Sequence, residues 1–366
     1  MKKKVCHITH GLVGSGVETV IFNYCSRMMN EFQFDVLYQY DPNPDVLSKF
    51  QNAGFNCIRI PSKVQHPLKH IWTVYKLFKM NRYEIVHSHL DYFMNSYVCF
   101  LAILAGIKKR IAHHHQAYTL LPNRSVKLLF REALCAIMRF PCKLFATDWL
   151  ACGKAAAING WGCNAIKKGE VTILPNAVDP ERFKFSESAR REIRAKYGIA
   201  DDDFVIGHVG RFYPQKNHDF LIDVFAEFRK QNANAKLLLL GDGPLQERVK
   251  QKIGLLGLSN CVIFAGVQKD SALFYSAMDV FALPSLWEGL PLTLVEAQYN
   301  GLCCLVSEFV TKEVEISPKI EYLSLEFSLW VLKISSLKYE NRILQQLCSD
   351  YDIKNQLPNL RSIYVS

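Results

Sequence analysis

The sequence of 366 residues is 49% hydrophobic and 21% charged, which supplies enough apolar material for a sizeable core and excludes a disordered chain. At about 100–200 residues per domain, this length favours two domains. The formal net charge of +10 indicates an anionic partner. Residues 1–175 hold 22 basic and 10 acidic residues, a net of +12, whereas residues 176–366 have a net of −2. We therefore expect the two halves to bind different partners.

The cysteine pattern and the apolar runs bear on the compartment. The 12 cysteines include no C-x-x-C pair, so neither a zinc knuckle nor a redox motif is indicated, and a reduced cytoplasmic setting fits best. The basic start at residues 1–4 is followed by His7 and His10 and not by a long apolar core, so we expect no signal peptide. The longest apolar run, residues 97–107, is shorter than the about 20 residues of a membrane span, so no spanning helix is expected.

Short apolar runs separated by stretches with helical spacing predict alternating strands and helices. In the first half, strands are predicted at residues 4–8, 34–38, 57–60, 84–89, 110–115, 144–151 and 171–174. After the turn-rich residues 175–180, strands are predicted at residues 204–209, 236–240, 261–264, 280–283 and 303–306. Beyond about residue 307 only helical segments are predicted. This order indicates an α/β protein with two doubly wound parallel domains in tandem.

Polar or glycine-rich segments follow the predicted strands of the first half, where a doubly wound sheet binds its ligands. The first strand leads into a loop with Gly14 and Gly16, the fourth ends at His87 and His89, and the fifth ends in the three histidines of residues 113–115. Five histidines at two strand ends also fit a metal site. However, no Asp, Glu or Cys lies beside them at ligand spacing, so we do not expect a metal.

The glycine loop after the first strand could also belong to a dinucleotide site. Its pattern is G-x-x-G-x-G and not G-x-G-x-x-G. In addition, no acidic residue follows the second strand at the expected place. We therefore do not expect a dinucleotide cofactor.

The segment from residue 285 to 301, SLWEGLPLTLVEAQYNG, is the most informative part of the second half. Pro291 is suited to the first position of a helix, so the free N–H groups of Leu292 and Thr293 would face a phosphate. Glu288 before the helix and Glu296 within it could then address two parts of one ligand. Alternatively, Glu288 only complements the helix dipole and Glu296 is a solvated surface residue.

A second loop, from Gly210 to Lys216, follows a predicted strand. A glycine there allows close approach of the backbone, and Arg211 and Lys216 can neutralise a diphosphate. The alternative is that both cations are solvated surface groups.

The basic half contains two segments with the spacing of basic amphipathic helices. Arg124, Lys127 and Arg131 form one, and Lys69, Trp72, Lys76 and Lys79 form the other. Together with the basic residues 108–110, they predict attraction to an anionic membrane surface. The alternative is that each is an ordinary helix packed on a sheet. No motif or aromatic–basic alternation supports nucleic acid as the partner.

Taken in order, these motifs resemble the retaining GT-B glycosyltransferases of family 4, and bacterial enzymes of capsular or extracellular polysaccharide are the most similar. The matching features are Glu288-x7-Glu296 with Gly289 and Leu290 between, the Gly210–Lys216 loop, Gly241-Asp242-Gly243-Pro244, residues 175–179 and the N-terminal glycine loop. The resemblance implies two Rossmann-like domains facing across a cleft. Residues 1–178 would bind the acceptor, residues 179–349 would bind the donor, and a helix at about residues 350–366 would pack back on the first domain.

The resemblance also implies roles for single residues. The catalytic residues would be Glu288, Arg211, Lys216 and His115, with His113 as the alternative histidine. The donor would be bound by Gly14, Gly16, Gly210, Gly241, Gly243, Val267, Gly289, Leu290, Leu292, Thr293 and Glu296. His87 and His89 would lie on the acceptor side. Neither a metal nor another cofactor is implied.

The implied activity is transfer of a sugar, with retention, from a nucleoside diphosphate sugar to a hydroxyl of a lipid-linked glycan in polysaccharide biosynthesis. A UDP-sugar is the preferred donor. The implied location is cytoplasmic, peripheral on the inner face of the cytoplasmic membrane. Two alternatives stay open: a nucleotide-sugar epimerase of the same architecture and a non-catalytic nucleotide-sugar-binding subunit.

Overall fold

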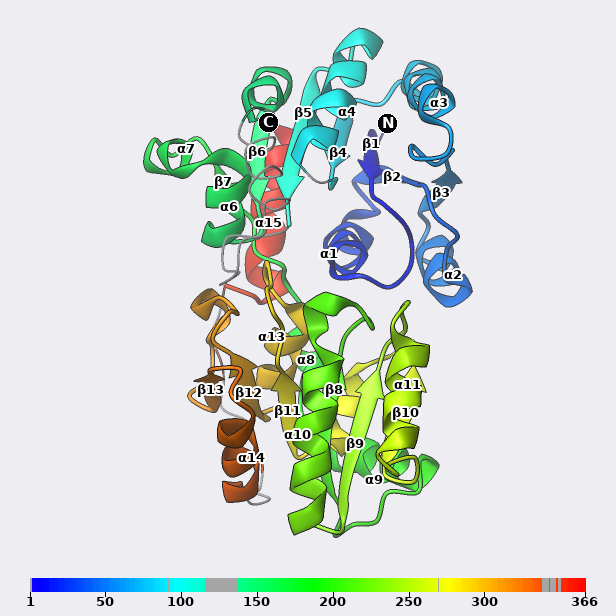
Figure 1. Cartoon of the computed structure of the whole chain (residues 1–366). Helices are drawn as coiled ribbons and strands as arrows, with labels where there is room; N and C mark the ends of the chain where they lie inside the picture. Colours follow the sequence, from blue (N-terminus) through cyan, green and yellow to red (C-terminus); the bar gives the residue numbers. More distant parts are fainter. Residues whose placement is uncertain are drawn as a thin grey trace. The chain divides into compact units, whose positions relative to one another are not determined.

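A computed structural model describes residues 2–90, 92–115, 137, 139–268, 270–337, 342, 347 and 350–366. The chain divides into two compact units, which we call the first unit (Met1–Ala177 with Asp350–Ser366) and the second unit (Val178–Ser349). Each unit contains a parallel sheet with helices around it (Figure 1). The expected α/β class with two doubly wound parallel sheets is confirmed.

The first unit is built on a seven-stranded sheet in the order β3-β2-β1-β4-β5-β6-β7. Its strands are β1 (Lys3–Ile8), β2 (Phe32–Tyr38), β3 (Asn56–Arg59), β4 (Ile85–Ser88), β5 (Lys109–His114), β6 (Asp148–Ala151) and β7 (Thr172–Ile173). Its α-helices are α1 (Gly16–Cys25), α2 (Pro44–Asn52), α3 (Pro67–Asn81), α4 (Tyr92–Ala105), α6 (Lys154–Trp161), α7 (Cys163–Lys167) and α15 (Ile353–Val365). A short 3₁₀ turn, η1 (Ser26–Met28), follows α1.

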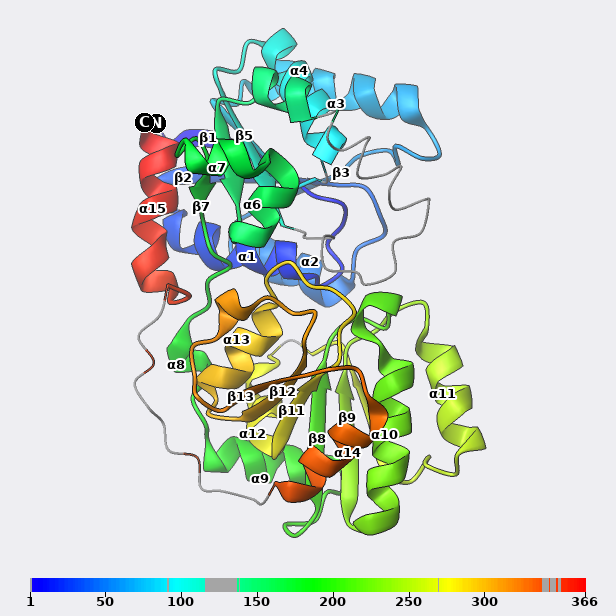
Figure 2. The same cartoon turned by 60° about the vertical axis from the view of Figure 1, so that its left-hand side comes forward.

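The last helix of the chain, α15, belongs to the first unit although residues 178–349 precede it. The Asp352 side chain caps its start by accepting from Lys354 N, and the helix packs against α1 (Figure 2). Near its end, Lys3 Nζ of β1 donates to Tyr364 O over 3.2 Å. Tyr364 itself is fully buried, so the last turn of α15 contributes to the core of the first unit.

The second unit is built on a six-stranded sheet in the order β10-β9-β8-β11-β12-β13. Its strands are β8 (Phe204–Val209), β9 (Ala235–Leu240), β10 (Val262–Gly266), β11 (Val280–Leu283), β12 (Cys303–Ser307) and β13 (Ile320–Leu323). Its α-helices are α8 (Pro180–Phe183), α9 (Glu187–Lys196), α10 (His218–Gln231), α11 (Gln246–Leu255), α12 (Ala272–Ala277), α13 (Leu292–Tyr299) and α14 (Phe327–Ser336). Two 3₁₀ turns are η2 (Pro214–Lys216) and η3 (Lys312–Val314).

Both sheets are covered by apolar side chains, which explains the continuous apolar runs of strands such as β9. In the second unit, Phe225 of α10 and Trp330 of α14 join Leu237 of β9 in one buried cluster. Each such side chain contributes about 1.5–3 kcal/mol by leaving water. The packed sheets therefore provide rigid edges from which the polar loops project.

Two expectations about the elements are wrong in part. Of the strand expected at residues 144–151, only residues 148–151 form a strand (β6), and residues 144–145 end a helix that covers residues 139–145. Beyond residue 307 the chain contains β13, which the sequence did not suggest because its IEYL run is short and interrupted by a charge. The basic residues Arg124, Lys127 and Arg131 lie outside the described residues. Among the helices that are described, none has both the length and the apolar composition needed to cross a bilayer.

Candidate functional site

The residues expected to bind the donor lie in the second unit, at the carboxyl ends of four neighbouring strands. Gly210, Arg211 and Lys216 follow β8, Gly241 and Gly243 follow β9, Val267 follows β10, and Glu288, Gly289 and Leu290 follow β11, whereas Leu292, Thr293 and Glu296 belong to α13. The sheet order places these four strands side by side. Parallel strands end at one edge of a sheet, so the structure gathers these residues at the edge where such folds bind ligands.

An ion pair joins the loops after β8 and β11. Lys216 Nζ lies 2.6 Å from Glu288 Oε1, and both side chains are largely buried. Ser285 Oγ donates to the same oxygen over 2.7 Å, and Gln215 Nε2 donates to Glu288 Oε2 over 3.0 Å. Three donors therefore fix the Glu288 carboxylate. The interpretation of Glu288 as a residue that only complements the helix dipole is inconsistent with these contacts.

The glycines after β8 and β9 are required by close backbone packing. Gly241 has a φ of +126°, and a Cβ at this position would collide with the carbonyl oxygen of Gly210. Gly243 has a φ of +152°, and its Cβ would lie 2.7 Å from Phe212 O. Phe212 N donates to Asp242 O over 2.8 Å, so the two loops are joined through their backbones. The loops can therefore present backbone groups to a ligand at short range.

Several polar groups at this edge are buried without a described partner. Arg211 Nε, Thr293 Oγ1 and His208 Nε2 form no hydrogen bond with any residue that the structure describes. The Arg211 guanidinium lies 4.8 Å above the ring of Tyr213, which holds the side chain over the loop. The other nitrogen of His208 faces Ala282 O at 2.8 Å, and burial lowers the pKa of this histidine to about 4. An anion could satisfy the arginine and the threonine together.

Helix α13 carries Glu296 as well as Leu292 and Thr293, the two residues expected to face a phosphate. It begins at Leu292 with Pro291 as the capping residue, one position later than the sequence indicated. Its first turn has N–H groups without partners inside the helix, which is the usual basis of an anion site. Glu296 is buried, and Tyr275 Oη donates to its Oε2 over 2.6 Å. Glu296 is therefore not a solvated surface residue, and Tyr275 is a partner that the sequence did not reveal.

In the first unit, the glycine loop is fixed by an acidic residue. Glu18 of α1 is 2% exposed and accepts hydrogen bonds from Val13 N (3.0 Å), Ser15 N (2.6 Å) and Ser15 Oγ (2.9 Å). Burial raises the pKa of Glu18. Gly14 has a φ of +84°, so a glycine is needed there, whereas a Cβ at Gly16 would meet nothing within 4 Å. Close packing therefore explains the glycine at position 14 but not the glycine at position 16.

The histidines of the first unit lie on three adjacent strands. His7 of β1 pairs in register with His87 of β4, and β5 carries His113, with His89 and His115 one residue beyond their strands. His113 is fully buried, whereas His115 is partly exposed at the end of its strand. His114 points to the other side and packs on Trp161 with ring centroids 4.8 Å apart, so it is a core histidine. Nothing in the local sequence pattern singled out His7, which the order of the strands brings beside His87.

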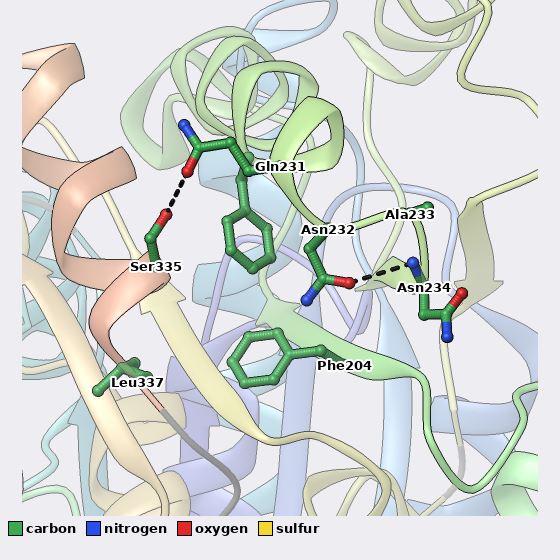
Figure 3. A pocket seen from close by; sticks show the side chains of 8 residues that line it. Phe204, Gln231, Asn232, Ala233, Asn234, Ser335 and Leu337 are labelled. Atoms are coloured by element: carbon green, nitrogen blue, oxygen red, sulfur yellow. Dashed lines mark hydrogen bonds between the residues drawn. The ribbon is translucent and has the colours of Figure 1, made fainter.

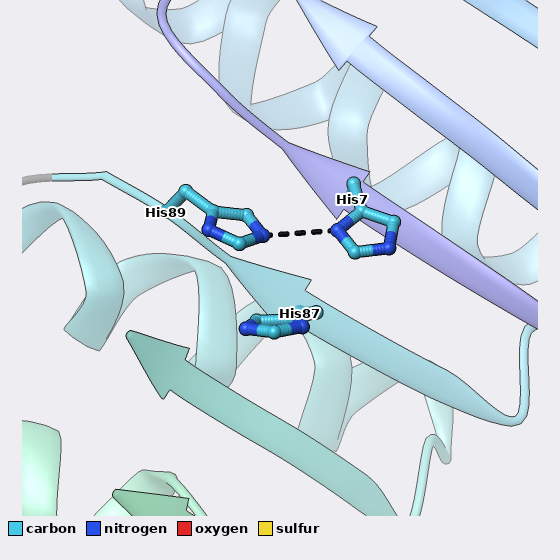
Figure 4. A group of neighbouring side chains, drawn as sticks. All are labelled: His7, His87 and His89. Atoms are coloured by element: carbon cyan, nitrogen blue, oxygen red, sulfur yellow. Dashed lines mark hydrogen bonds between the residues drawn. The ribbon is translucent and has the colours of Figure 1, made fainter. Parts of the chain in front are cut away.

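Two sets of these histidines have ligand atoms close enough to be considered for a metal. They are His7, His87 and His89 (Figure 4) and His89, His113 and His115, whose atoms lie within 4.8 Å of one another. His7 Nδ1 and His89 Nε2 are 2.9 Å apart. Two nitrogens bound to one tetrahedral zinc at 2.0–2.1 Å would be about 3.3 Å apart. The observed separation is shorter than that and lies in the range of a hydrogen bond.

A separate cavity lies at the opposite edge of the second sheet. It has a volume of about 410 Å³ and is lined by Phe204, Phe228, Gln231, Asn232, Ala233, Asn234, Ser335 and Leu337 (Figure 3). Phe204 begins β8 and Asn234 directly precedes β9, so the cavity is at the amino ends of the strands. Ligands of doubly wound sheets bind at the carboxyl ends, and the cavity has no charged lining residue. We do not assign it to the candidate site.

Comparisons with known proteins agree with this architecture. Residues 14–182 match the family model of Glycosyltransferase Family 4, and residues 189–317 match that of Glycosyl transferases group 1. EpsF of Bacillus subtilis, named as a glycosyltransferase, is 31% identical over 383 aligned residues, which cover 99% of this chain and 96% of EpsF.

Two further proteins are similar over most of their length. The UDP-Gal:alpha-D-GlcNAc-diphosphoundecaprenol alpha-1,3-galactosyltransferase of Escherichia coli is 28% identical, covering 84% of this chain and 79% of the relative. The solved structure of HepE from Anabaena in complex with UDP and glucose has a TM-score of 0.78 at 16% identity and covers 99% of each chain. The two family models, the similarity to EpsF over nearly the whole chain and the two parallel sheets lead to one conclusion. This chain belongs to the GT-B glycosyltransferases of family 4.

Proposed function

We propose that this glycosyltransferase moves a sugar, with retention, from a nucleoside diphosphate sugar to a hydroxyl of a lipid-linked glycan in polysaccharide biosynthesis. The second unit binds the donor, preferably a UDP-sugar, and the first unit binds the acceptor. One observation carries the donor assignment: Lys216 and Glu288 form an ion pair at the strand edge that also carries Arg211 and the start of α13. This arrangement places cations, free N–H groups and one carboxylate around one ligand position.

The chemistry follows from the charges. A departing diphosphate needs compensation of its negative charge while the sugar becomes cation-like. Arg211 binds the phosphates through its fork, Lys216 supplies a point charge, and the first turn of α13 supplies N–H groups and Thr293 Oγ1. When Lys216 turns to the diphosphate, Glu288 is released to bind the transferred sugar. Glu296 then accepts from the ribose hydroxyls, and the loop at Val267 faces the base.

The names of the relatives support the choice of donor and acceptor. The Escherichia coli relative is named for UDP-Gal and for a diphosphoundecaprenol-linked saccharide, and HepE was solved with UDP and glucose. Of the two candidate histidines of the first unit, we choose His115 for the contact with the sugar, because it lies at the strand end while His113 is fully buried. His87 and His89 belong to the acceptor side of the same unit.

The decisive test is transfer by the full chain from UDP-sugars to a lipid-linked acceptor. Arg211→Ala and Lys216→Ala should each lower turnover on the order of 10²–10³-fold, because each removes a preorganised charge. Lys230→Ala is the matched control, since this exposed lysine of α10 pairs with the surface residue Glu227 and follows none of the strand ends of the site. Near-normal turnover in both site variants would overturn the assignment. Conversion of the donor without acceptor would identify an epimerase, and tight donor binding without turnover would identify a binding subunit.

We place the enzyme on the inner face of the cytoplasmic membrane through α3. One side of this helix is buried by His70, Val74 and Phe78, while Leu68, Ile71, Trp72 and Met80 are exposed between Lys69, Lys76 and Lys79. Lys76 Nζ lies 4.9 Å above the Trp72 ring. A helix packed on a sheet in water rarely exposes this many large apolar side chains beside lysines. At a membrane surface, the apolar side chains insert among the lipids and the lysines contact the anionic headgroups.

Binding to vesicles tests this placement. Full-length protein should sediment with anionic but not with neutral liposomes, at about 1 kcal/mol for each lysine near the surface. Leu68→Ser combined with Trp72→Ala should lower the bound fraction severalfold. Leu332→Ser, which removes an exposed leucine of the second unit, should not. Equal binding to both kinds of vesicle would contradict the proposal.

A further inference from the structure

Five histidine rings of the first unit form two stacked rows of imidazoles, which we call the histidine rows. In the first row, His7 Nδ1 lies 2.9 Å from His89 Nε2, and His89 Nδ1 lies 2.9 Å from His115 Nε2. In the second row, His87 Nε2 lies 3.3 Å from His113 Nδ1. His87 stacks on His89 with centroids 4.1 Å apart, as Figure 4 shows for the inner part of the rows. The outer pair, His113 and His115, has centroids 4.0 Å apart.

The inner ends of both rows are closed by two residues from helices. Tyr364 Oη of α15 lies 2.7 Å from His87 Nδ1 and 3.3 Å from His7 Nε2. Cys25 Sγ of α1 lies 3.3 Å from the same nitrogen of His7. Tyr364, Cys25, His7 and His87 are all buried. The first row therefore runs from a closed interior to the partly exposed His115, whereas the second row ends at the buried His113.

Four rings of the rows, those of His7, His87, His89 and His113, are held in the neutral form by burial. Burial lowers the pKa of His7 to about 3, and it also lowers the pKa values of His87, His89 and His113. A neutral imidazole has one N–H donor and one bare nitrogen acceptor. Each hydrogen bond along a row therefore decides which nitrogen of the next ring carries the proton.

Tyr364 and Cys25 determine in which direction the hydrogen bonds of the first row are donated. A phenol donates well to an imidazole, and the 2.7 Å contact favours donation of the Tyr364 proton to His87 over the longer 3.3 Å contact to His7. At 3.3 Å the sulfur of Cys25 is in close contact with His7 Nε2, whereas the same separation is long for a bond to the Tyr364 oxygen. Burial raises the pKa of the Cys25 thiol, which keeps its proton available for donation. His7 then donates from Nδ1 to His89, and His89 donates from Nδ1 to His115 Nε2.

We propose that His7 and His89 are positioning residues that hold His115 as the neutral Nδ1–H tautomer. In this tautomer the proton of His115 is on Nδ1, an atom that is buried in the structure, and His115 does not act as a base through Nε2, which accepts the proton of His89. The use of this tautomer in transfer rests on the proposed function. The tautomer itself rests only on the hydrogen bonds within the first unit.

The tautomer can be measured directly in the full chain with ¹⁵N-labelled histidine. Long-range ¹H–¹⁵N spectra at pH 7.5 distinguish a protonated Nδ1 from a protonated Nε2. We expect His115 to be a neutral ring with the proton on Nδ1. A proton on Nε2, or a rapidly exchanging mixture, would overturn the proposal. A shift of the His7, His89 and His115 signals on titration with Zn²⁺ at stoichiometric concentration would show a metal site instead and would also overturn it.

Two substitutions of one residue separate positioning from packing. His89→Gln keeps an acceptor for His7 and a donor for His115, whereas His89→Phe keeps the bulk and removes both. We expect His89→Phe to lose the Nδ1–H signature and to lower kcat about 10- to 100-fold, with His89→Gln restoring most of both. The control His70→Gln alters a buried histidine outside the rows, which pairs with Pro61 O and Tyr97 Oη, and should leave the tautomer unchanged.

The outcomes also separate this inference from the proposed function. Equal kcat and equal spectra for His89→Gln and His89→Phe would overturn the positioning role even in an active transferase. Conversely, an Nδ1–H tautomer that depends on His89 in a protein without transferase activity would uphold the rows and reject the proposed function. Should His89→Phe not fold, the spectrum of the unaltered protein still decides the tautomer.

Discussion

The two units use the same scaffold but satisfy the polar groups at their strand ends differently. In the first unit, neutral imidazoles share protons along the histidine rows. In the second unit, the corresponding edge holds a Lys–Glu ion pair and glycine loops. The unit with the large positive charge thus has an uncharged set of groups at its strand ends, while the nearly neutral unit has charged ones. Net charge therefore reports the outer surface and not the chemistry of the site.

The difference extends to the cores. The second unit buries Asp279 against two arginines: Arg190 Nη2 lies 2.7 Å from Oδ1 and Arg194 Nη2 lies 2.8 Å from Oδ2. Val205 N also donates to Oδ2 over 2.7 Å. The described part of the first unit holds its buried histidines without any comparable ion triad. The units should therefore respond differently to pH and to loss of charge.

Acidification should produce the largest difference in stability between the two units. Because burial depresses the folded-state pKa values of His7, His87, His89 and His113, the unfolded chain binds more protons below pH 6.5. Stability is fully present above that pH and falls as the pH drops towards 3. At pH 5.5 the loss is about 1 kcal/mol per ring, or about 4–6 kcal/mol for the four rings.

Hydrogen exchange of β4 and β8 amides at pH 7.5 and 5.5 would follow the units separately. In the second unit, burial lowers the pKa of His208 to about 4 and that of His218 to about 2. With two such rings and not four, the second unit should lose about half as much stability as the first. His7→Phe should make the first unit less sensitive to pH. An equal loss in both units would contradict the comparison.

Removing the buried charge of the second unit should have the next largest effect. Asp279→Asn leaves two buried arginines without their carboxylate, and should lower the free energy of unfolding of the second unit by about 3–5 kcal/mol. Urea titration followed by exchange of β8 amides measures it. The matched control Glu227→Gln breaks an exposed pair and should change stability by less than about 1 kcal/mol. A loss below 1 kcal/mol in Asp279→Asn would refute the importance of the triad.

A smaller effect is expected at the glycine loop of the first unit. Glu18→Ala leaves Val13 N, Ser15 N and Ser15 Oγ without their acceptor and should cost about 1–3 kcal/mol. Glu18→Gln keeps an acceptor oxygen and should cost less. Thermal unfolding of both variants decides this, and identical melting temperatures would show that the loop does not depend on the carboxylate.

The sequence predicted the fold better than it predicted the contacts. Alternation of apolar runs was sufficient for two parallel sheets, because both are buried on both faces. It placed the start of β6 too early, because the apolar end of a helix at residues 144–145 lies just before this strand, and it missed β13, whose run is too short to be recognised. Local patterns do not include strand order, and strand order is what places His7 beside His87.

For the candidate site too, local spacing indicated the position but not the contacts. The spacing of Glu288 and Glu296 around Gly-Leu-Pro indicated the donor edge, since those residues are close in the chain. The partners that fix them were not visible: Ser285 and Gln215 bond to Glu288, and Tyr275 bonds to Glu296. Such contacts depend on side-chain directions in the folded unit, which spacing alone does not supply.

The position of Tyr364 has a consequence for synthesis on the ribosome. Residues 178–349 are translated before α15, so a nascent chain can contain every histidine of the rows and still lack the phenol that closes them. The polar interior of the first unit is therefore completed only after the second unit has been made. The unit translated first is therefore the one whose strand-end groups are completed last, after the second unit has been made.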